Sequence, residues 1–247
     1  MKWIKASWPA PEFIKAGTTV RTGGVSQAPY DSFNLATHVG DEPSQVLQNR
    51  QQFLSELKLT TAPHWLEQTH STEAILLPAN ETLVKADASY SFEKKTVCVV
   101  MTADCLPLLI TDKEGSCVAA IHAGWRGLAD GIVERTIAQL PAKEESLLVW
   151  LGPAIGAKVY EVGEEVYDAF TEADIEAQQA FQEVVVQGMS EKHWLFDIYH
   201  MATLKLKRLG INHIYGGDFC TFSDEQQFYS YRRDGVTGRM ASFIWMD

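Results

Sequence analysis

The sequence lacks the features that direct a chain into a membrane or onto nucleic acid. No apolar run approaches the roughly 20 residues that a membrane span requires, and the N-terminus shows no apolar stretch with a small-residue cleavage site. Positive charge is scarce, because 21 Lys and Arg face 32 Asp and Glu for a net charge of −11. An acidic chain repels phosphate backbones. We therefore expect a cytoplasmic protein with neither membrane nor nucleic-acid partners.

Cysteine is also sparse, and its four copies form no C-x-x-C pair. Dense disulfide frameworks are typical of small secreted domains rather than of a chain this long. Cys98 and Cys117 lie inside apolar runs, which favours buried and reduced thiols. The cysteine pattern therefore indicates a reducing compartment.

The sequence does contain helix and strand patterns in an interspersed order, without a linker or a fixed-period repeat. Apolar spacing of three and four predicts helices over residues 43–59, 128–140, 161–171 and 198–209, the second of them following a break at 124–127. Short apolar or β-branched runs predict strands over 63–77, 96–103, 106–111, 117–122, 147–151, 182–187, 211–215 and 241–245. Because the two types do not strictly alternate, we expect one α/β domain of the α+β kind over residues 1–247, with mixed sheets.

Arg50 has an unusual position in the first predicted helix, because it falls in the middle of the apolar stripe. A guanidinium keeps its charge at working pH, so on a buried face it needs an anion. Two interpretations have equal weight. The anion is either a distant carboxylate in a structural ion pair or a bound ligand.

A predicted hairpin brings a cysteine and a histidine together. If its turn centres on Lys113-Glu114, then Cys105 and His122 are equidistant from the turn and face each other. Directly opposed residues project from one face with Cβ atoms about 5 Å apart. Such a pair suits shared ligation of zinc, a Cys–His nucleophilic dyad, or a buried thiol beside a hydrogen-bonded histidine. The hairpin alone leaves all three open.

His70 follows an apolar-to-polar transition that is typical of a strand entering a loop. Nothing in the local sequence brings it to the hairpin. Its spacing from Cys105 and His122 matches no compact zinc finger. Three protein ligands would leave the fourth position of a tetrahedral zinc ion to water or substrate, which is the catalytic arrangement.

Eight motifs occur in chain order, and together they carry a family resemblance from about residue 17 to 246. They are VRTGGVS (20–26), PYDSFNL (29–35), HVGD (38–41) with NR (49–50), EQTH (67–70), TADCLP (102–107), HAGWRG (122–127), GPAIG (152–156), and YSYRRD (229–234) through TGRM (237–240). The chain resembles the laccase-domain family of purine nucleoside phosphorylases, whose members are also labelled polyphenol oxidases and peptidoglycan editing factors. Phe33 stands where leucine is commoner in the family.

The resemblance implies a four-layer α/β/β/α sandwich. It also implies zinc held by two histidines and one cysteine, and the motifs place these ligands at His70, Cys105 and His122. The implied activities are phosphorolysis of adenosine, guanosine, inosine and methylthioadenosine to base and ribose 1-phosphate, and deamination of adenosine. We therefore expect purine nucleosides and phosphate as the binding partners, and a monomer or weak homo-oligomer.

The remaining roles have candidates of the right chemistry. Phosphorolysis needs an anion site, for which we expect Arg50 and Arg21. His38 would orient phosphate or act as an acid, or it simply fills a loop. Asp104 is either a proton carrier in deamination or a turn residue, because the H-x-E motif of known zinc deaminases is absent. Trp125 would stack on a purine, but packing at the rim is the stronger expectation.

The densest cation group consists of Arg232, Arg233 and Arg239, and a solvated or structural group is expected rather than an anion pocket. Copper is an alternative metal, because blue-copper sites also use two histidines and a cysteine, and Met101 is near in sequence. A true laccase needs further coppers and many more than the seven histidines present.

Two further functions stay open. A cysteine hydrolase acting on peptidoglycan precursors would use Cys105 as its nucleophile and would survive chelation. A non-catalytic binding module would hold metal without consuming inosine in the presence of phosphate.

Overall fold

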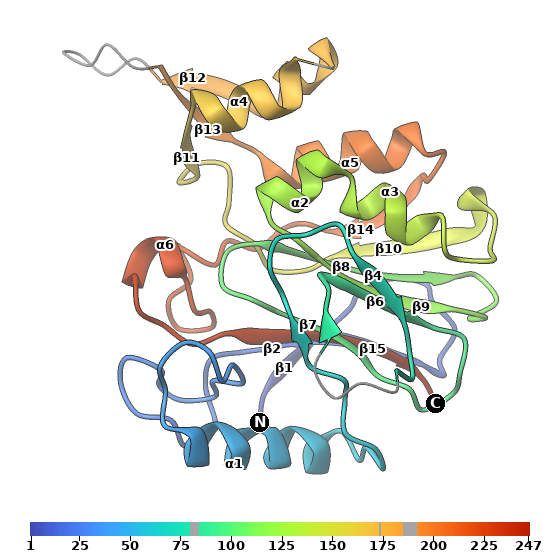
Figure 1. Cartoon of the computed structure of the whole chain (residues 1–247), viewed down its shortest axis with the longest axis vertical. Coiled ribbons are helices and arrows are strands. Elements are labelled where there is room, and N and C mark those ends of the chain that lie inside the picture. Colours follow the sequence, from blue (N-terminus) through green and yellow to red (C-terminus); the bar gives the residue numbers. More distant parts are fainter. Residues whose placement is uncertain (80–83, 173, 185–191) are drawn as a thin grey trace.

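The computed structural model describes residues 1–79, 84–172, 174–184 and 192–247. Its elements form four stacked layers (Figure 1). The first layer is α1 (Pro43–Glu56). The second is a four-stranded sheet in the order β1 (Trp3–Lys5), β2 (Ile14–Thr19), β15 (Met240–Met246), β7 (Cys98–Thr102).

The third layer is a mixed six-stranded sheet. Its order is β14 (His213–Gly216), β10 (Leu147–Leu151), β8 (Leu106–Asp112), β9 (Val118–Ala123), β6 (Ala88–Ser91), β4 (Ala74–Leu76). The fourth layer contains α2 (Trp125–Asp130), α3 (Ile132–Ile137) and α5 (Ile198–Arg208). The expected α/β sandwich with mixed sheets is confirmed. Within the described ranges, no helix is both long enough and apolar enough to cross a membrane.

Side-chain alternation along the strands distributes the core over three interfaces. In β7, Val99 and Met101 pack toward α1 with Phe53, while Cys98 and Val100 pack toward the six-stranded sheet. A separate cluster lies between that sheet and the helices of the fourth layer. Because β7, β8, β9 and β10 are buried on both faces, they appear as continuous apolar runs in the sequence.

A small antiparallel sheet stands beside the sandwich (Figure 1). It contains β11 (Glu161–Gly163), β13 (His193–Phe196) and β12 (Phe181–Val184), and it carries α4 (Glu164–Thr171) and the 3₁₀ helix η2 (Ile175–Ala180). The rings of Tyr167 and Trp194 stack with centroids 4.3 Å apart. The strand predicted over 182–187 is confirmed as far as Val184, and its remainder lies outside the described residues.

Several predicted boundaries were wrong. The helix predicted over 128–140 begins earlier, at Trp125, and is divided into α2 and α3, because Gly131 adopts a left-handed conformation with φ 97°. The strand predicted over 63–77 is interrupted by a loop that contains His70 and separates β3 (Leu66–Glu67) from β4. The sequence pattern did not indicate β1, β2, β5 (Val84–Lys85), β6, β11, β13, α6 (Tyr231–Asp234) or the 3₁₀ helices η1 (Glu144–Ser146) and η2.

Candidate metal centre

The hairpin of β8 and β9 has a different register from the predicted one. His122 lies opposite Pro107, so the turn centres on Glu114-Gly115 rather than on Lys113-Glu114. Pro107 is two residues beyond Cys105, and a displacement of two keeps residues on the same face of a strand. The predicted direct opposition is therefore wrong, whereas the predicted proximity of Cys105 and His122 is confirmed.

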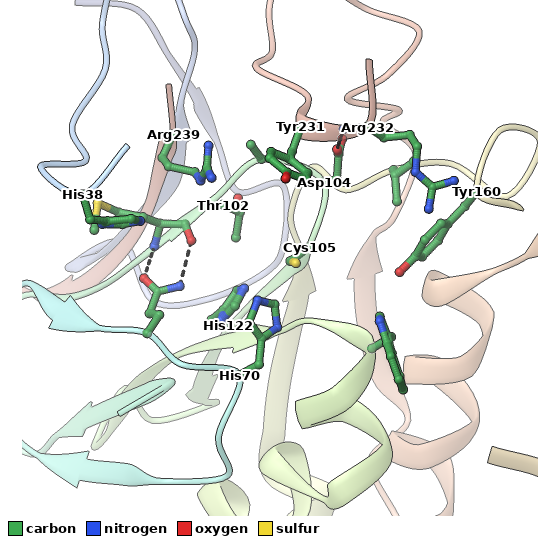
Figure 2. A pocket seen from close by; sticks show the side chains of 15 residues that line it. His38, His70, Thr102, Asp104, Cys105, His122, Tyr160, Tyr231, Arg232 and Arg239 are labelled. Atoms are coloured by element: carbon green, nitrogen blue, oxygen red, sulfur yellow. Dashed lines mark hydrogen bonds between the residues drawn. The ribbon is translucent and has the colours of Figure 1, made fainter. Parts of the chain in front are cut away.

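The three histidine and cysteine side chains predicted from the motifs converge on one point (Figure 2). Donor atoms of His70, Cys105 and His122 all lie within 4.8 Å of one another. The two imidazole rings meet edge to face with their centroids 4.8 Å apart. Across the described residues, no other group of three or more His, Cys, Asp or Glu side chains comes together in this way. Two imidazoles and a thiolate fit zinc or copper.

A buried carboxylate holds this cluster together, and the sequence did not point to it. Asp87 Oδ1 accepts hydrogen bonds from His122 Nδ1, at 2.7 Å, and from the His70 backbone N–H, at 3.1 Å. Its Oδ2 accepts the backbone N–H groups of Thr69 and Ser71 and the Ser71 hydroxyl. Since His122 Nδ1 is engaged by Asp87, Nε2 is left as the donor atom.

The protonation of the cluster follows from these contacts. Burial opposes ionisation of Asp87, but hydrogen bonds from His122 and Ser71 outweigh it and lower the Asp87 pKa to about 2. Burial likewise lowers the pKa of His122, but Cys105 and Asp87 raise it more strongly, to about 9. The pKa of His70 is lowered by burial and by His122. Cys105 and Asp87 therefore favour a positive charge at His122. Either a proton or a metal ion would supply this charge, so the two would compete for the His122 imidazole.

Two residues at the centre adopt left-handed backbone conformations, with φ 60° at His70 and 97° at Asp104. Such conformations are strained for residues other than glycine and need support from their surroundings. At His70 the Asp87 carboxylate supplies it. At Asp104, Oδ1 accepts a hydrogen bond from the Thr221 hydroxyl at 2.6 Å, and Oδ2 accepts one from the backbone N–H of Arg232 at 2.7 Å. Both oxygens of Asp104 are therefore used to fix the loop that presents Cys105.

Gly124 leaves the space that the cluster occupies. A Cβ atom built on Gly124 would lie 2.4 Å from His70 Nδ1 and 3.2 Å from Cys105 Sγ. Both distances are shorter than carbon, nitrogen and sulfur atoms tolerate without displacement. The residue that precedes α2 must therefore be a glycine if His70 and Cys105 are to keep their positions.

The cluster forms one wall of a cavity of about 490 Å³, a size that suits a small-molecule ligand. Trp125 and His38, both predicted at the site, line this cavity, as do Tyr160, Arg232 and Arg239. Gln68 also lines the cavity. Its amide exchanges two hydrogen bonds with the backbone of Met101, at 2.7 and 2.8 Å, drawn as dashed lines in Figure 2.

One end of the cavity is cationic. Arg239 and His38 lie there (Figure 2), and Arg50 lies close enough to affect His38. Burial, followed by the charges of Arg239 and Arg50, lowers the pKa of His38. Arg239 donates to the carbonyls of Thr237 and Gly238, and no described carboxylate forms an ion pair with it. The cationic end therefore has charge available for an anionic ligand.

Neither of the arginines predicted for phosphate binding lines this cavity. The Arg50 guanidinium stacks on Trp65 at 4.1 Å and donates to the Leu35 carbonyl, and burial lowers its pKa to about 10. No described carboxylate pairs with Arg50, and its positive charge therefore acts on His38. Arg50 itself does not line the cavity. Arg21 pairs with Asp31 and lines a different groove.

Two of the three C-terminal arginines, which were expected to be solvated or structural, lie at the cavity. Arg232 and Arg239 line the cavity, whereas Arg233 is structural and donates to three backbone carbonyls. The sequence signal for these arginines was the motif over 229–240 that contains all three. The motif does not show which arginine lines the cavity, because that depends on how the loop folds around α6.

The fold and the cluster together define a candidate metalloprotein of the four-layer α/β class. More narrowly, the chain belongs to the family described as multi-copper polyphenol oxidoreductase laccase, whose model matches residues 15–247.

Individual relatives carry a different description. A purine nucleoside phosphorylase of Haemophilus influenzae is 49% identical and covers 100% of both chains. One of Escherichia coli is 46% identical over 99% of both. A solved structure from Neisseria meningitidis is similar with a TM-score of 0.92 at 46% identity, covering 100% of both chains. The laccase description and the phosphorylase names therefore apply to the same full-length fold.

Proposed function

We propose that this chain is a zinc-dependent purine nucleoside phosphorylase that also deaminates adenosine. Its substrates would be adenosine, guanosine, inosine and methylthioadenosine. One observation carries the proposal: a single cavity combines the donor cluster of His70, Cys105 and His122 with a cationic end at His38 and Arg239. The phosphorylase names of relatives 46–49% identical over nearly the whole chain support it.

In phosphorolysis, the bond between ribose C1′ and the base nitrogen breaks, and its electron pair leaves with the base. A phosphate oxygen forms the new bond to C1′, and the base takes up a proton. Arg239 binds the phosphate through its charge, and the lowered pKa of His38 leaves a neutral imidazole that donates one N–H. Tyr160 lies on the opposite side of the metal centre (Figure 2), and with Trp125, which also lines the cavity, it would provide an aromatic wall for the purine.

His70, Cys105 and His122 would hold the metal, with Asp87 fixing the two histidines. When bound, zinc supplies Lewis acidity and lowers the pKa of water in its open position. In deamination, water adds at C6 of adenine and ammonia departs. Asp104 is the single carboxylate on the described wall of the cavity. Because both its oxygens already accept hydrogen bonds, we assign it to positioning Cys105 rather than to proton transfer.

The decisive experiment is a purification without added metal, followed by measurement of zinc and copper and an assay of inosine with and without phosphate. We expect about one zinc per chain, and ribose 1-phosphate only when phosphate is present. A full complement of zinc with no phosphate-dependent loss of inosine would contradict the proposal. Bound copper with oxidation of phenols would instead support the family description.

A second function is favoured by one specific contact. Asp87, His122 and Cys105 lie in the order of a nucleophilic triad, with the carboxylate orienting the histidine beside the thiol. A cysteine hydrolase acting on peptidoglycan precursors would use these three residues without a metal ion. His70 has no role in such a triad, and its convergence on the same point favours the metal. Activity that survives chelation and is lost on alkylation of Cys105 would establish the hydrolase.

A further inference from the structure

One polar group on the cavity wall has no partner within the described part of the chain. The Thr102 side chain ends β7 and is 1% exposed, and its hydroxyl makes no hydrogen bond there. Buried hydroxyls are normally hydrogen-bonded, because leaving one unpaired destabilises the folded state. An orphaned hydroxyl on a residue that lines a ligand cavity therefore points to a ligand atom as its partner.

The position of Thr102 restricts which ligand atom that is. Thr102 follows Val100 on the face of β7 that looks toward the six-stranded sheet, from which His122 projects. Figure 2 shows its side chain between Cys105 and Arg239, and its hydroxyl therefore lies between the metal donors and the cationic end.

We propose that Thr102 is a phosphate-binding residue whose hydroxyl donates a hydrogen bond to an oxygen of the phosphate held at Arg239 and His38. The proposal rests on the phosphorylase function and deepens it. A neutral donor is suited to this place, because a third cation would repel a metal ion at the neighbouring cluster. As a β-branched residue in a strand, threonine also holds its hydroxyl in few rotamers, so little conformational entropy is lost on binding.

The first test is Thr102→Val, which replaces the hydroxyl by a methyl group of similar size. We expect the KM for phosphate to rise about 10-fold or more, as for loss of a hydrogen bond to a charged partner. The KM for inosine and the zinc content should stay as in the parent protein. Thr102→Ser, which restores a hydroxyl, should recover most of the affinity for phosphate.

Thermal unfolding supplies a readout that does not depend on turnover. Without phosphate, Thr102→Val should unfold at the same or a higher temperature, because the unpaired hydroxyl is removed. Phosphate should raise the unfolding temperature of the parent protein, and this increase should be lost in the variant. A purely structural hydroxyl would give the opposite result, namely a lower unfolding temperature and an unchanged response to phosphate.

Ser89→Ala is the matched control, since the Ser89 hydroxyl is also buried and unpaired among the described residues but does not line the cavity. It should leave the KM for phosphate unchanged. An unaltered KM for phosphate in Thr102→Val, or an increase confined to inosine, would overturn the proposal. If phosphate stabilises the parent but not Thr102→Val, while no ribose 1-phosphate forms, the contact between Thr102 and phosphate is supported. The same result would contradict the phosphorylase function.

Discussion

The two ends of the cavity are built by different means. At the metal end, one buried carboxylate accepts five hydrogen bonds and fixes side chains that come from different strands and loops. At the cationic end, Arg239 and Arg50 are held by backbone carbonyls and, for Arg50, by an aromatic ring. Metal ligation requires donor atoms placed to within tenths of an ångström, whereas charge attracts an anion over several ångströms. Rigid support therefore belongs at the metal end.

Removing a ligand should produce the largest effect. Cys105→Ala and His122→Ala each leave two donors, so we expect loss of stoichiometric zinc and a decrease in kcat of more than about 100-fold. Zinc content after dialysis and the rate of inosine phosphorolysis are the measurements. Cys220→Ala is the control, because Cys220 lies outside the cluster and the cavity wall. Retention of zinc by Cys105→Ala would show that the cysteine is no ligand.

The supporting carboxylate should come next. Asp87→Asn keeps the shape but weakens the hold on His122 and the His70 loop, and we expect zinc affinity to fall about 10- to 100-fold. Competition with a chromogenic chelator measures it. A zinc affinity equal to that of the parent would mean that the carboxylate has no part in ligand orientation.

The same variant tests the stability of the metal-free protein against pH. Hydrogen bonds from His122 and Ser71 depress the folded-state pKa of Asp87 to about 2, from its ordinary value of 3.8. Its stabilisation is therefore present above about pH 4 and is lost as pH falls toward 2. Asp87→Asn should unfold more readily than the parent at neutral pH, and the difference should shrink in acid. Urea unfolding at pH 7, 4 and 3 checks this sign.

Steric disruption at the metal end should be milder. Gly124→Ala places a methyl group against His70 and Cys105, so we expect zinc affinity to fall about 10-fold while the fold is retained. Gly163→Ala is the matched control, because Gly163 also precedes a helix and has open space around its Cβ position. Equal zinc affinity in the two variants would mean that the cluster tolerates displacement of His70.

The cationic end should respond in substrate affinity rather than in metal content. Arg239→Gln should raise the KM for phosphate about 10-fold with zinc unchanged, because it removes a charged donor from the cavity wall. Arg21→Gln should change the KM less than about 2-fold, since Arg21 pairs with Asp31 and faces another groove. The reverse order of effects would place the anion site at Arg21.

The sequence predicted the layers better than it predicted the site. Strands buried on both faces are recognisable in the sequence as apolar runs. Most of the predicted helices and strands are present within a few residues of their predicted bounds. The hairpin register was wrong because the turn allows Gly115 a positive φ, which a centre at Lys113-Glu114 does not use. Cys105 and His122 nevertheless project from the same face of the sheet, because a register displacement of two residues keeps a side chain on its face.

The supporting residues of the site depend on contacts that no local pattern contains. Asp87 is separated by 17 residues from His70 and by 35 from His122, and its surroundings resemble an ordinary loop. Arg50 was expected to meet an anion, but stacking on Trp65 satisfies it in a way that apolar periodicity cannot indicate. The convergence of His70 with the hairpin required the family resemblance for the same reason.

The exposure gradient across the cluster has a kinetic consequence. His122 is buried, Cys105 is half-buried and His70 is exposed. The left-handed turn at His70 and its bonds to Asp87 form when the chain folds, so capture of an ion does not have to order the loop. Because His70 is the most exposed of the three residues that would hold the metal, we expect an arriving ion to meet His70 before Cys105 and His122. Metal exchange would then be limited by dehydration of the ion rather than by opening of the fold.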